Sequence, residues 1–203
     1  MQRHFILFDD TRRLNLLPFT FTRPVAEIRI GILTIREKWE MVLGETCSFL
    51  TADYLYKKFQ PANGDKESHL INGGIIPDPK LLDLILKLKI GQAITFDTTL
   101  IAALLPSTPS PSYAPEISHF KELIVLTESP FCITNLWDIF SQNKRALEQD
   151  FELITNRRKS EQISNTNQVI NADRIFIEKG AKVECAILNA DNGPIYIGAD
   201  AEI

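Results

Sequence analysis

The heptapeptide His-Phe-Ile-Leu-Phe-Asp-Asp, residues 4–10, sets the first expectation for the fold. Its first five residues form a short, mostly apolar run, which is typical of a strand buried on both faces of a sheet. The run stops at two carboxylates, Asp9 and Asp10, which do not continue a buried strand. This segment therefore predicts a strand that ends in a polar loop.

Strands and helices are predicted to alternate after this first strand. Apolar residues recur at helical spacing from Val25 to Leu43, and Asp78-Pro79 supplies a cap and a first-turn proline for another helix. Further strands are predicted at 47–51, 69–72, 93–97 and 123–126, a further helix at 136–149, and an exposed loop in the proline-rich segment 106–118. This alternation indicates an α/β domain with a mostly parallel sheet that is covered on both faces.

The pattern changes near residue 160. Two hexads, Ile177–Val183 and Ile197–Ile203, each span the sixfold spacing of aliphatic residues that is typical of hexapeptide repeats. Two β-hairpins with glycine turns are the alternative. We expect residues 1–160 to form the α/β domain and residues 161–203 to form a linker and the first turns of a left-handed parallel β-helix. Because such a helix needs about three stacked repeats, we expect the chain to be a truncated part of a longer protein.

The composition argues against several classes of partner. The chain has 203 residues and a formal net charge of −4, and its richest basic stretch is Arg157–Lys159. A solvated linker explains that stretch about as well as a phosphate contact does. Since nucleic acids and anionic membranes require a larger basic patch, neither is an expected partner. No apolar run has the length of a signal peptide core or a membrane span, and we expect a cytoplasmic protein.

Several segments resemble the sugar-1-phosphate nucleotidyltransferase family. Leu17–Pro24 is similar to the family signature that follows the phosphate-binding loop, and Leu7–Asp10, Thr22–Ala26 and Ile28–Glu40 resemble a divergent branch of the family. The order of elements is similar to that of bifunctional enzymes that join an N-acetylglucosamine-1-phosphate uridylyltransferase domain to a β-helix with glucosamine-1-phosphate acetyltransferase activity. The resemblance implies a Rossmann-like nucleotidyltransferase domain.

The activity implied by this resemblance is transfer of a nucleotidyl group from a nucleoside triphosphate to a sugar-1-phosphate, with release of pyrophosphate. Those two small molecules are the expected partners, and Mg²⁺ is the expected cofactor. Charged residues just after the first strand suit this chemistry, because guanidinium groups bind phosphates and carboxylates bind hard cations. The expected catalytic residues are Asp10, Arg13 and Arg23, the expected nucleotide- and phosphate-binding residues are Arg12, Arg29, Asn72, Gly73, Gly74 and Asn135, and the expected metal ligands are Asp9 and Asp10.

Other roles are open for several of these residues. The arginines also suit ion pairs with Asp9, Asp10 and Glu27 on a solvated rim. A turn or cap explains Asp10 as well as a metal does, and an N-cap explains Asn135.

The chain departs from the family pattern at three places. Residues 9–17 contain no glycine, Val25 stands where the family has a lysine, and Gly74 stands where a metal-binding aspartate is expected. These departures favour an alternative function: a catalytically degenerate module that binds a nucleotide sugar or serves a structural role beside a β-helix acyltransferase. A further alternative places the main activity in a β-helix continuation. The family's acyl-transfer sites lie between subunits, so we expect a homo-oligomer formed through the β-helix of the full-length protein.

Overall fold

The computed structural model describes residues 3–61 and 65–203, and these divide into two compact units. The first unit contains the chain up to Arg29 together with Leu33–Ile139, and the second contains Ile30–Ile32 together with Phe140–Ile203. The predicted division into domains at residue 160 stays a prediction. None of the helices within the described ranges is long and apolar enough to cross a membrane.

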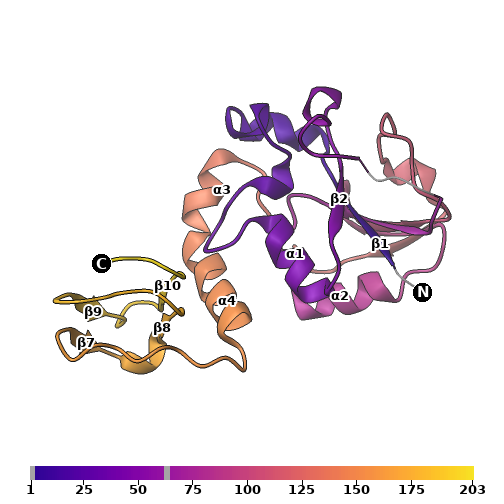
Figure 1. The fold of residues 1–203 in the computed structure, drawn as a ribbon. Helices are drawn as coiled ribbons and strands as arrows, with labels where there is room; N and C mark the ends of the chain where they lie inside the picture. Colours follow the sequence, from indigo (N-terminus) through magenta and orange to yellow (C-terminus); the bar gives the residue numbers. More distant parts are fainter. Residues whose placement is uncertain (1–2, 62–64) are drawn as a thin grey trace. The chain divides into compact units, whose positions relative to one another are not determined.

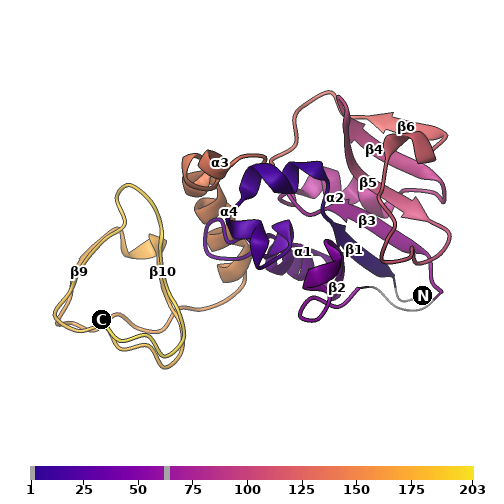
Figure 2. The same ribbon diagram turned by 90° about the horizontal axis from the view of Figure 1, so that it is seen from above.

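A six-stranded sheet forms the centre of the first unit as far as the structure describes it, and its strands lie side by side in the order β2-β1-β3-β5-β4-β6 (Figure 2). Only β5 runs against the others, so the sheet is mostly parallel and suits a Rossmann-like α/β domain. The strands are β1 (His4–Phe8), β2 (Cys47–Leu50), β3 (Ser68–Asn72), β4 (Gln92–Phe96), β5 (Thr99–Leu105) and β6 (Glu122–Val125).

The first long helix is shorter than the sequence predicts. Helix α1 covers Ile35–Leu43 (Figure 1), whereas residues 25–27 form only a single 3₁₀ turn. Thr34 starts the helix with a capping box, in which its hydroxyl accepts from the Glu37 N–H and the Glu37 carboxylate accepts from the Thr34 N–H. Gly31, at φ 77°, has a left-handed backbone that no continuous helix contains. The predicted helix over 25–43 is therefore wrong before Thr34.

The structure differs from the sequence prediction at two of the later elements. Strand β5 (Thr-Leu-Ile-Ala-Ala-Leu-Leu) lies outside the predicted strands, and Asp97 adopts a positive φ in the short turn that separates it from β4. The helix predicted over 136–149 is two helices, α3 (Leu136–Ser141) and α4 (Asn143–Thr155). Helix α2 (Pro79–Leu86) begins as predicted, and the Asp78 carboxylate accepts hydrogen bonds from the N–H groups of Lys80 and Leu81.

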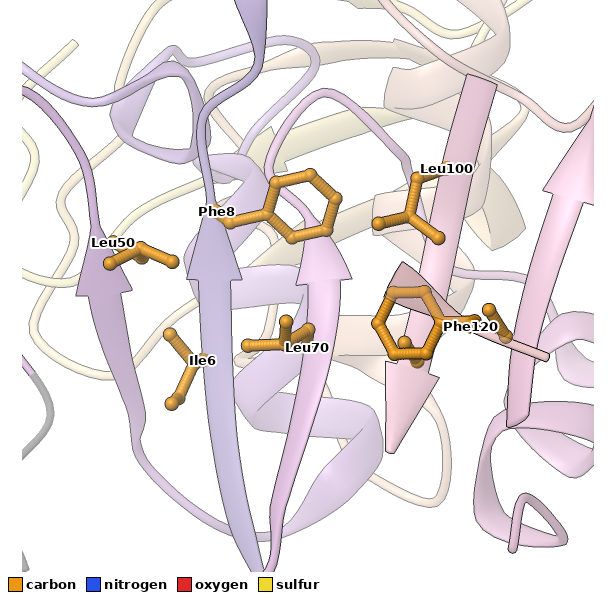
Figure 3. Close-up of a cluster of buried hydrophobic side chains, with 8 residues drawn as sticks. Ile6, Phe8, Leu50, Leu70, Leu100 and Phe120 are labelled. Carbon is orange, nitrogen blue, oxygen red and sulfur yellow. The ribbon is translucent and has the colours of Figure 1, made fainter. Parts of the chain in front are cut away.

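One face of the sheet is closed by the proline-rich segment rather than by a helix. Tyr113 and Ile117 of this segment pack against the apolar cluster on that face, and Phe120 belongs to the cluster. The labelled members in Figure 3 are Ile6, Phe8, Leu50, Leu70, Leu100 and Phe120. The segment is irregular and largely exposed, as predicted, but its apolar residues cover the sheet. This places it beside the loops that follow β1 and β3.

The second unit contains α4 and four short strands, yellow in Figure 1. They are β7 (Gln168–Ile170), β8 (Ile175–Ile177), β9 (Ile187–Asn189) and β10 (Ile195–Ile197). Strands β8 and β10 pair in parallel, as do β7 and β9, with each residue opposite one that lies 19 or 20 positions further along. A hairpin pairs its strands antiparallel. The alternative of two β-hairpins is therefore wrong for these strands.

Stability between pH 6.5 and 4 is expected to depend on His69. This residue of β3 is only 6% exposed, and burial, followed by the nearby Arg3, lowers its pKa to about 4. The unfolded chain takes up a proton at His69 near pH 6.5, whereas the folded chain does so only near pH 4. The free energy of unfolding should therefore fall by about 2–3 kcal/mol over this window as the pH decreases.

Urea unfolding at pH 7 and pH 4.2 measures this effect. The His69→Gln variant should lose the part of the pH dependence that His69 contributes, about 2–3 kcal/mol, whereas His119→Gln, at an exposed position, should keep it. His4, whose pKa burial also lowers, adds a contribution that both variants retain. Equal pH dependence in His69→Gln and the parent chain would show that His69 is not the responsible group.

Candidate active site

The polar residues that follow β1 lie at the carboxyl edge of the sheet. Phe8, the last residue of β1, pairs with Leu50 of β2 and Asn72 of β3, so the chain segments after these three strands emerge at the same edge. Strand β5 runs in the opposite direction and therefore begins there, at Thr99. Ligands of open α/β sheets bind at this edge, which makes it the place to look for an active site.

Asp9 connects the segments at this edge through its buried carboxylate, which is 3% exposed. It accepts hydrogen bonds from the Val25 N–H at 2.9 Å and from the Thr51 hydroxyl at 2.5 Å, and the Arg13 Nε lies 3.4 Å away. Burial raises the pKa of Asp9, although its hydrogen bonds and Arg13 act in the opposite direction. Asp9 therefore joins the end of β1 to the end of β2 and to the turn at Val25.

Asp10 forms a second network with Arg12 and Asn72. Its carboxylate, 25% exposed, caps the 3₁₀ turn Thr11–Leu16 by accepting from the Arg12 N–H at 2.9 Å. The Arg12 guanidinium donates to Asp10 Oδ2 at 2.8 Å from Nε and lies 2.5 Å from it at Nη2. The buried Asn72 amide also donates to Oδ2, at 2.8 Å, and to the Leu100 carbonyl, at 3.1 Å. The cap role of Asp10 is thus confirmed, and its carboxylate holds the guanidinium in place.

Arg13 is held on the other side of the loop. Its Nη2 donates to the Thr20 carbonyl at 2.6 Å and to the Tyr54 hydroxyl at 3.1 Å. Its Nε is buried without a hydrogen-bond partner in the described part of the chain, since Asp9 is near enough for an ion pair but poorly aligned. The pairing of arginines with Asp9 and Asp10, one of the two alternatives from the sequence, is therefore present for Arg12 and Arg13. Glu27 pairs instead with Arg36.

Gly73 and Gly74 continue β3 into a tightly packed turn. The Gly73 N–H donates to the Phe8 carbonyl, and the Gly74 N–H donates to the Asn72 side-chain oxygen. A Cβ added at Gly74 would lie 2.9 Å from the carbonyl oxygen of Ile133, a contact that forces the backbone to move. The position where the family has a metal-binding aspartate therefore has no room for a side chain here.

A cleft of about 710 Å³ opens beside these residues. Asp9, Asp10, Arg12 and Arg13 line one side of it, and the segment 114–118 lines another. Thr98–Leu100 at the start of β5 also contributes, and Arg12 Nη1 donates to the Thr99 hydroxyl at 3.4 Å. The proline-rich segment that was predicted as an exposed loop therefore forms a wall of the cleft.

Six of the predicted site residues lie outside the lining of this cleft, as the described residues define it: Asn72, Gly73 and Gly74, in and after β3, and Arg23, Arg29 and Asn135. Arg23 is exposed in the segment before Pro24. Arg29 is exposed and lies 3.7 Å from Glu37. Asn135 lies just before α3, where its N–H donates to the Asp138 carboxylate and its amide donates to the Thr134 hydroxyl. The side chain that accepts hydrogen bonds from the backbone at the start of α3 is therefore that of Asp138.

Sequence reasoning missed several polar residues of the site, among them Thr20, Thr51, Tyr54 and Thr99. Thr51 carries a usable signal, because it ends a strand that pairs in parallel with β1 and must reach the same edge. Tyr54 and Thr20 belong to the site only because they contact Arg13 and each other. Thr99 belongs to it only because β5 is antiparallel to its neighbours and so begins at this edge of the sheet, where Thr99 contacts Arg12. No local pattern marks these three.

The mostly parallel sheet, with a cleft at the carboxyl edge beside the end of β1, is typical of a Rossmann-like α/β domain. A family model described as sugar nucleotidyl transferase matches residues 5–159, which is most of the chain. The chain belongs to this sugar nucleotidyl transferase family. No curated protein matches it.

The carboxylates fit a metal ion only in part. Within residues 3–61 and 65–203, no group of three or more His, Cys, Asp or Glu side chains is arranged to hold one. Asp9 has both carboxylate oxygens in hydrogen bonds with Val25 and Thr51. Asp10 is the more exposed of the two, but a metal would have to displace Arg12 from it. Both Asp10 oxygens also accept hydrogen bonds, from the Arg12 N–H and guanidinium and from the Asn72 amide. One carboxylate suffices for Mg²⁺ when substrate phosphates supply further ligands, and Asp10 fits better than Asp9 only because it is more exposed.

Proposed function

We propose that this chain transfers a nucleotidyl group from a nucleoside triphosphate to a sugar-1-phosphate and releases pyrophosphate. In this reaction a phosphate oxygen of the sugar-1-phosphate attacks the α-phosphorus, and the bond from that phosphorus to the leaving pyrophosphate breaks. The family match supports this class of reaction, and the cleft at the carboxyl edge of the sheet supports the proposed location of the active site. The observation that carries the proposal is the Arg12 guanidinium in the cleft wall, at the carboxyl edge of the sheet.

Arg12 is the residue we propose to bind the triphosphate. Its guanidinium lines the cleft and is held there by one carboxylate and one hydroxyl, which orient its planar fork before a ligand arrives. Arg13 is more enclosed, at 15% exposed, and contacts three groups of the loop. We therefore propose that Arg13 positions the 3₁₀ turn Thr11–Leu16, which also contains Arg12. The roles that the sequence predicts for Arg23 in catalysis and for Arg29 and Asn135 in phosphate binding require these residues to approach the cleft when substrate binds.

Mg²⁺ is proposed to bind at Asp10 together with the triphosphate. Asp10 Oδ2 already accepts from Arg12 and Asn72. A metal ion alone must compete with the positive charge of Arg12, whereas a triphosphate offers Arg12 a new partner and frees Asp10. We therefore expect Mg²⁺ to bind weakly by itself and more tightly once a nucleoside triphosphate is present.

The second unit is proposed to be the start of a hexapeptide β-helix. The support is the parallel pairing of β8 with β10 and of β7 with β9, at a spacing of 19 or 20 residues, which brings successive turns of chain into contact. Aliphatic side chains gather in one cluster between these turns, among them Ile177, Val183 and Ile197. Further turns of the β-helix beyond these strands would carry the acyl-transfer site and the contacts between subunits.

Calorimetric titration with a panel of nucleoside triphosphates and nucleotide sugars, with and without Mg²⁺, tests the proposal. We expect at least one triphosphate to bind in a metal-dependent manner, and pyrophosphate to be released when a panel of sugar-1-phosphates is added. Failure of every triphosphate to bind would remove the cleft as a nucleotide site.

Arg12→Gln should weaken triphosphate binding by about 10- to 100-fold, because it removes a charged hydrogen bond worth roughly 1.5–3 kcal/mol. Lys121→Gln, which removes a positive charge at an exposed position outside the cleft lining, is the control and should bind as the parent chain does. The dissociation constant from the same titration is the measurement. An unchanged constant in Arg12→Gln would contradict the role of this residue.

The second candidate function is a module that binds a nucleotide sugar without catalysis. The specific observation in its favour is the absence of space for a carboxylate at Gly74, together with the use of both Asp9 oxygens in hydrogen bonds. Binding of a nucleotide sugar with no release of pyrophosphate from any triphosphate would favour this function over transfer.

A further inference from the structure

A second pocket, of about 780 Å³, lies at the opposite edge of the sheet. Arg3 directly precedes β1 and Lys66 closely precedes β3, so this is the edge at which the parallel strands begin. Leu104 of β5 pairs with His69 there, and Leu86 ends helix α2. The pocket therefore shares no lining residue with the cleft at the carboxyl edge.

The lining of this pocket has an apolar part and a charged part. Leu86, Leu88, Leu104 and Pro106 form the apolar part. Arg3 and Lys66 line the charged part together with the carboxylates of Asp65 and Glu67. Neither cation forms an ion pair with a carboxylate of residues 3–61 or 65–203, so both can reach a ligand.

His69 joins the two parts. Its ring packs against Phe5, with 5.1 Å between the ring centroids, and only 6% of the residue is exposed. Its Nδ1 is buried and has no hydrogen-bond partner among the described residues. Burial and the charge of Arg3 lower its pKa to about 4, so the ring is neutral at pH 7. A buried polar atom without a partner costs stability, and such positions in native proteins call for an explanation.

We propose that this pocket binds a small ligand that combines an apolar ring with a phosphate or similar anionic group. Arg3 and Lys66 bind the anionic group, Leu86, Leu88 and Leu104 contact the ring, and the neutral imidazole of His69 lies beside them in the lining. The site is independent of nucleotidyl transfer, because its residues belong to the other edge of the sheet. A ligand here would act as a regulator, and its failure to bind would leave the proposal for the cleft unaffected.

Proton NMR of the histidine rings tests this site with three probes at pH 7: phenyl phosphate, inorganic phosphate and uncharged phenol. The chain has three histidines, so single substitutions assign their signals. We expect phenyl phosphate to shift the His69 signal in a saturable way and to bind at least about tenfold more tightly than either other probe. The signal of His119, whose Nδ1 lies 2.9 Å from the Tyr113 hydroxyl, should stay in place.

Arg3→Gln and Lys66→Gln should each weaken phenyl phosphate binding about fivefold or more, and Lys121→Gln, at an exposed position outside the pocket, should not change it. The proposal would be overturned by a lack of saturable shift at His69, or by equal affinity for phenol and phenyl phosphate. Unchanged affinity in both cation variants would overturn it as well. Binding of phenyl phosphate that is lost in Arg12→Gln but kept in Arg3→Gln would place the probe in the cleft instead, which also overturns it.

Discussion

Trp39→Ala is expected to lower the free energy of unfolding of the first unit by about 3–5 kcal/mol, the usual cost of removing a large aromatic side chain from a core. Trp39 lies on helix α1 and is 0% exposed. Its indole N–H donates to the Ile75 carbonyl at 2.8 Å, so the substitution also leaves a buried acceptor without its partner. The contact joins α1 to the turn after β3, which supports the carboxyl edge of the sheet.

Urea unfolding followed by circular dichroism measures this loss. Met41→Ala, on the same helix but 47% exposed, is the matched control and should cost less than about 1 kcal/mol. A Trp39→Phe variant should cost less than Trp39→Ala, because it keeps most of the apolar volume but not the hydrogen bond. Equal stability of Trp39→Ala and Met41→Ala would contradict the central position of Trp39.

Gly74→Asp is expected to destabilise the first unit by about 2–4 kcal/mol and to leave pyrophosphate release no higher than in the parent chain. The added Cβ meets the Ile133 carbonyl oxygen at 2.9 Å, and overpacking of this kind costs about 1–3 kcal/mol. The new carboxylate would also be enclosed, which adds a desolvation cost. Restoring the family's aspartate to this position therefore should not restore a metal site.

Gly74→Ala separates the two causes, since it introduces the Cβ without the charge. Gly198→Asp is the control for an added carboxylate, because nothing lies within 4 Å of a Cβ at Gly198. A Gly74→Asp chain that is as stable as its parent and releases more pyrophosphate in the presence of Mg²⁺ would show that this turn opens readily. That result would assign the metal to position 74 rather than to Asp10.

Part of the candidate site could be predicted from local sequence. A buried strand that ends in two carboxylates places Asp9 and Asp10 at an edge of the sheet, and the adjacent arginines follow within one turn. Asn72 and Gly73 were predicted from the resemblance to the family, and they lie at and just after the end of the buried strand β3. The local sequence does not predict which carboxylate oxygen accepts a hydrogen bond from which donor. Asp9 finds Val25 and Thr51 at separations of 16 and 42 residues, and no periodicity encodes such contacts.

The sequence by itself determined the elements whose signals are local. The apolar run of β1, the aspartate-proline start of α2 and the change of pattern near residue 160 each depend on neighbouring residues, whose propensities act before any tertiary contact forms. The C-terminal hexads also marked a region that pairs its strands in parallel. These features were enough to indicate an α/β domain and a site after its first strand.

Only the tertiary structure decided that β5 runs against its neighbours and that residues 114–118 form a wall of the cleft. It also decided that Gly74 has no space for a side chain, because Ile133 approaches it from a segment 59 positions away in the chain. The physical reason is the same in each case. Close packing and backbone hydrogen bonds between distant segments override local propensity, and they act only once the sheet has assembled.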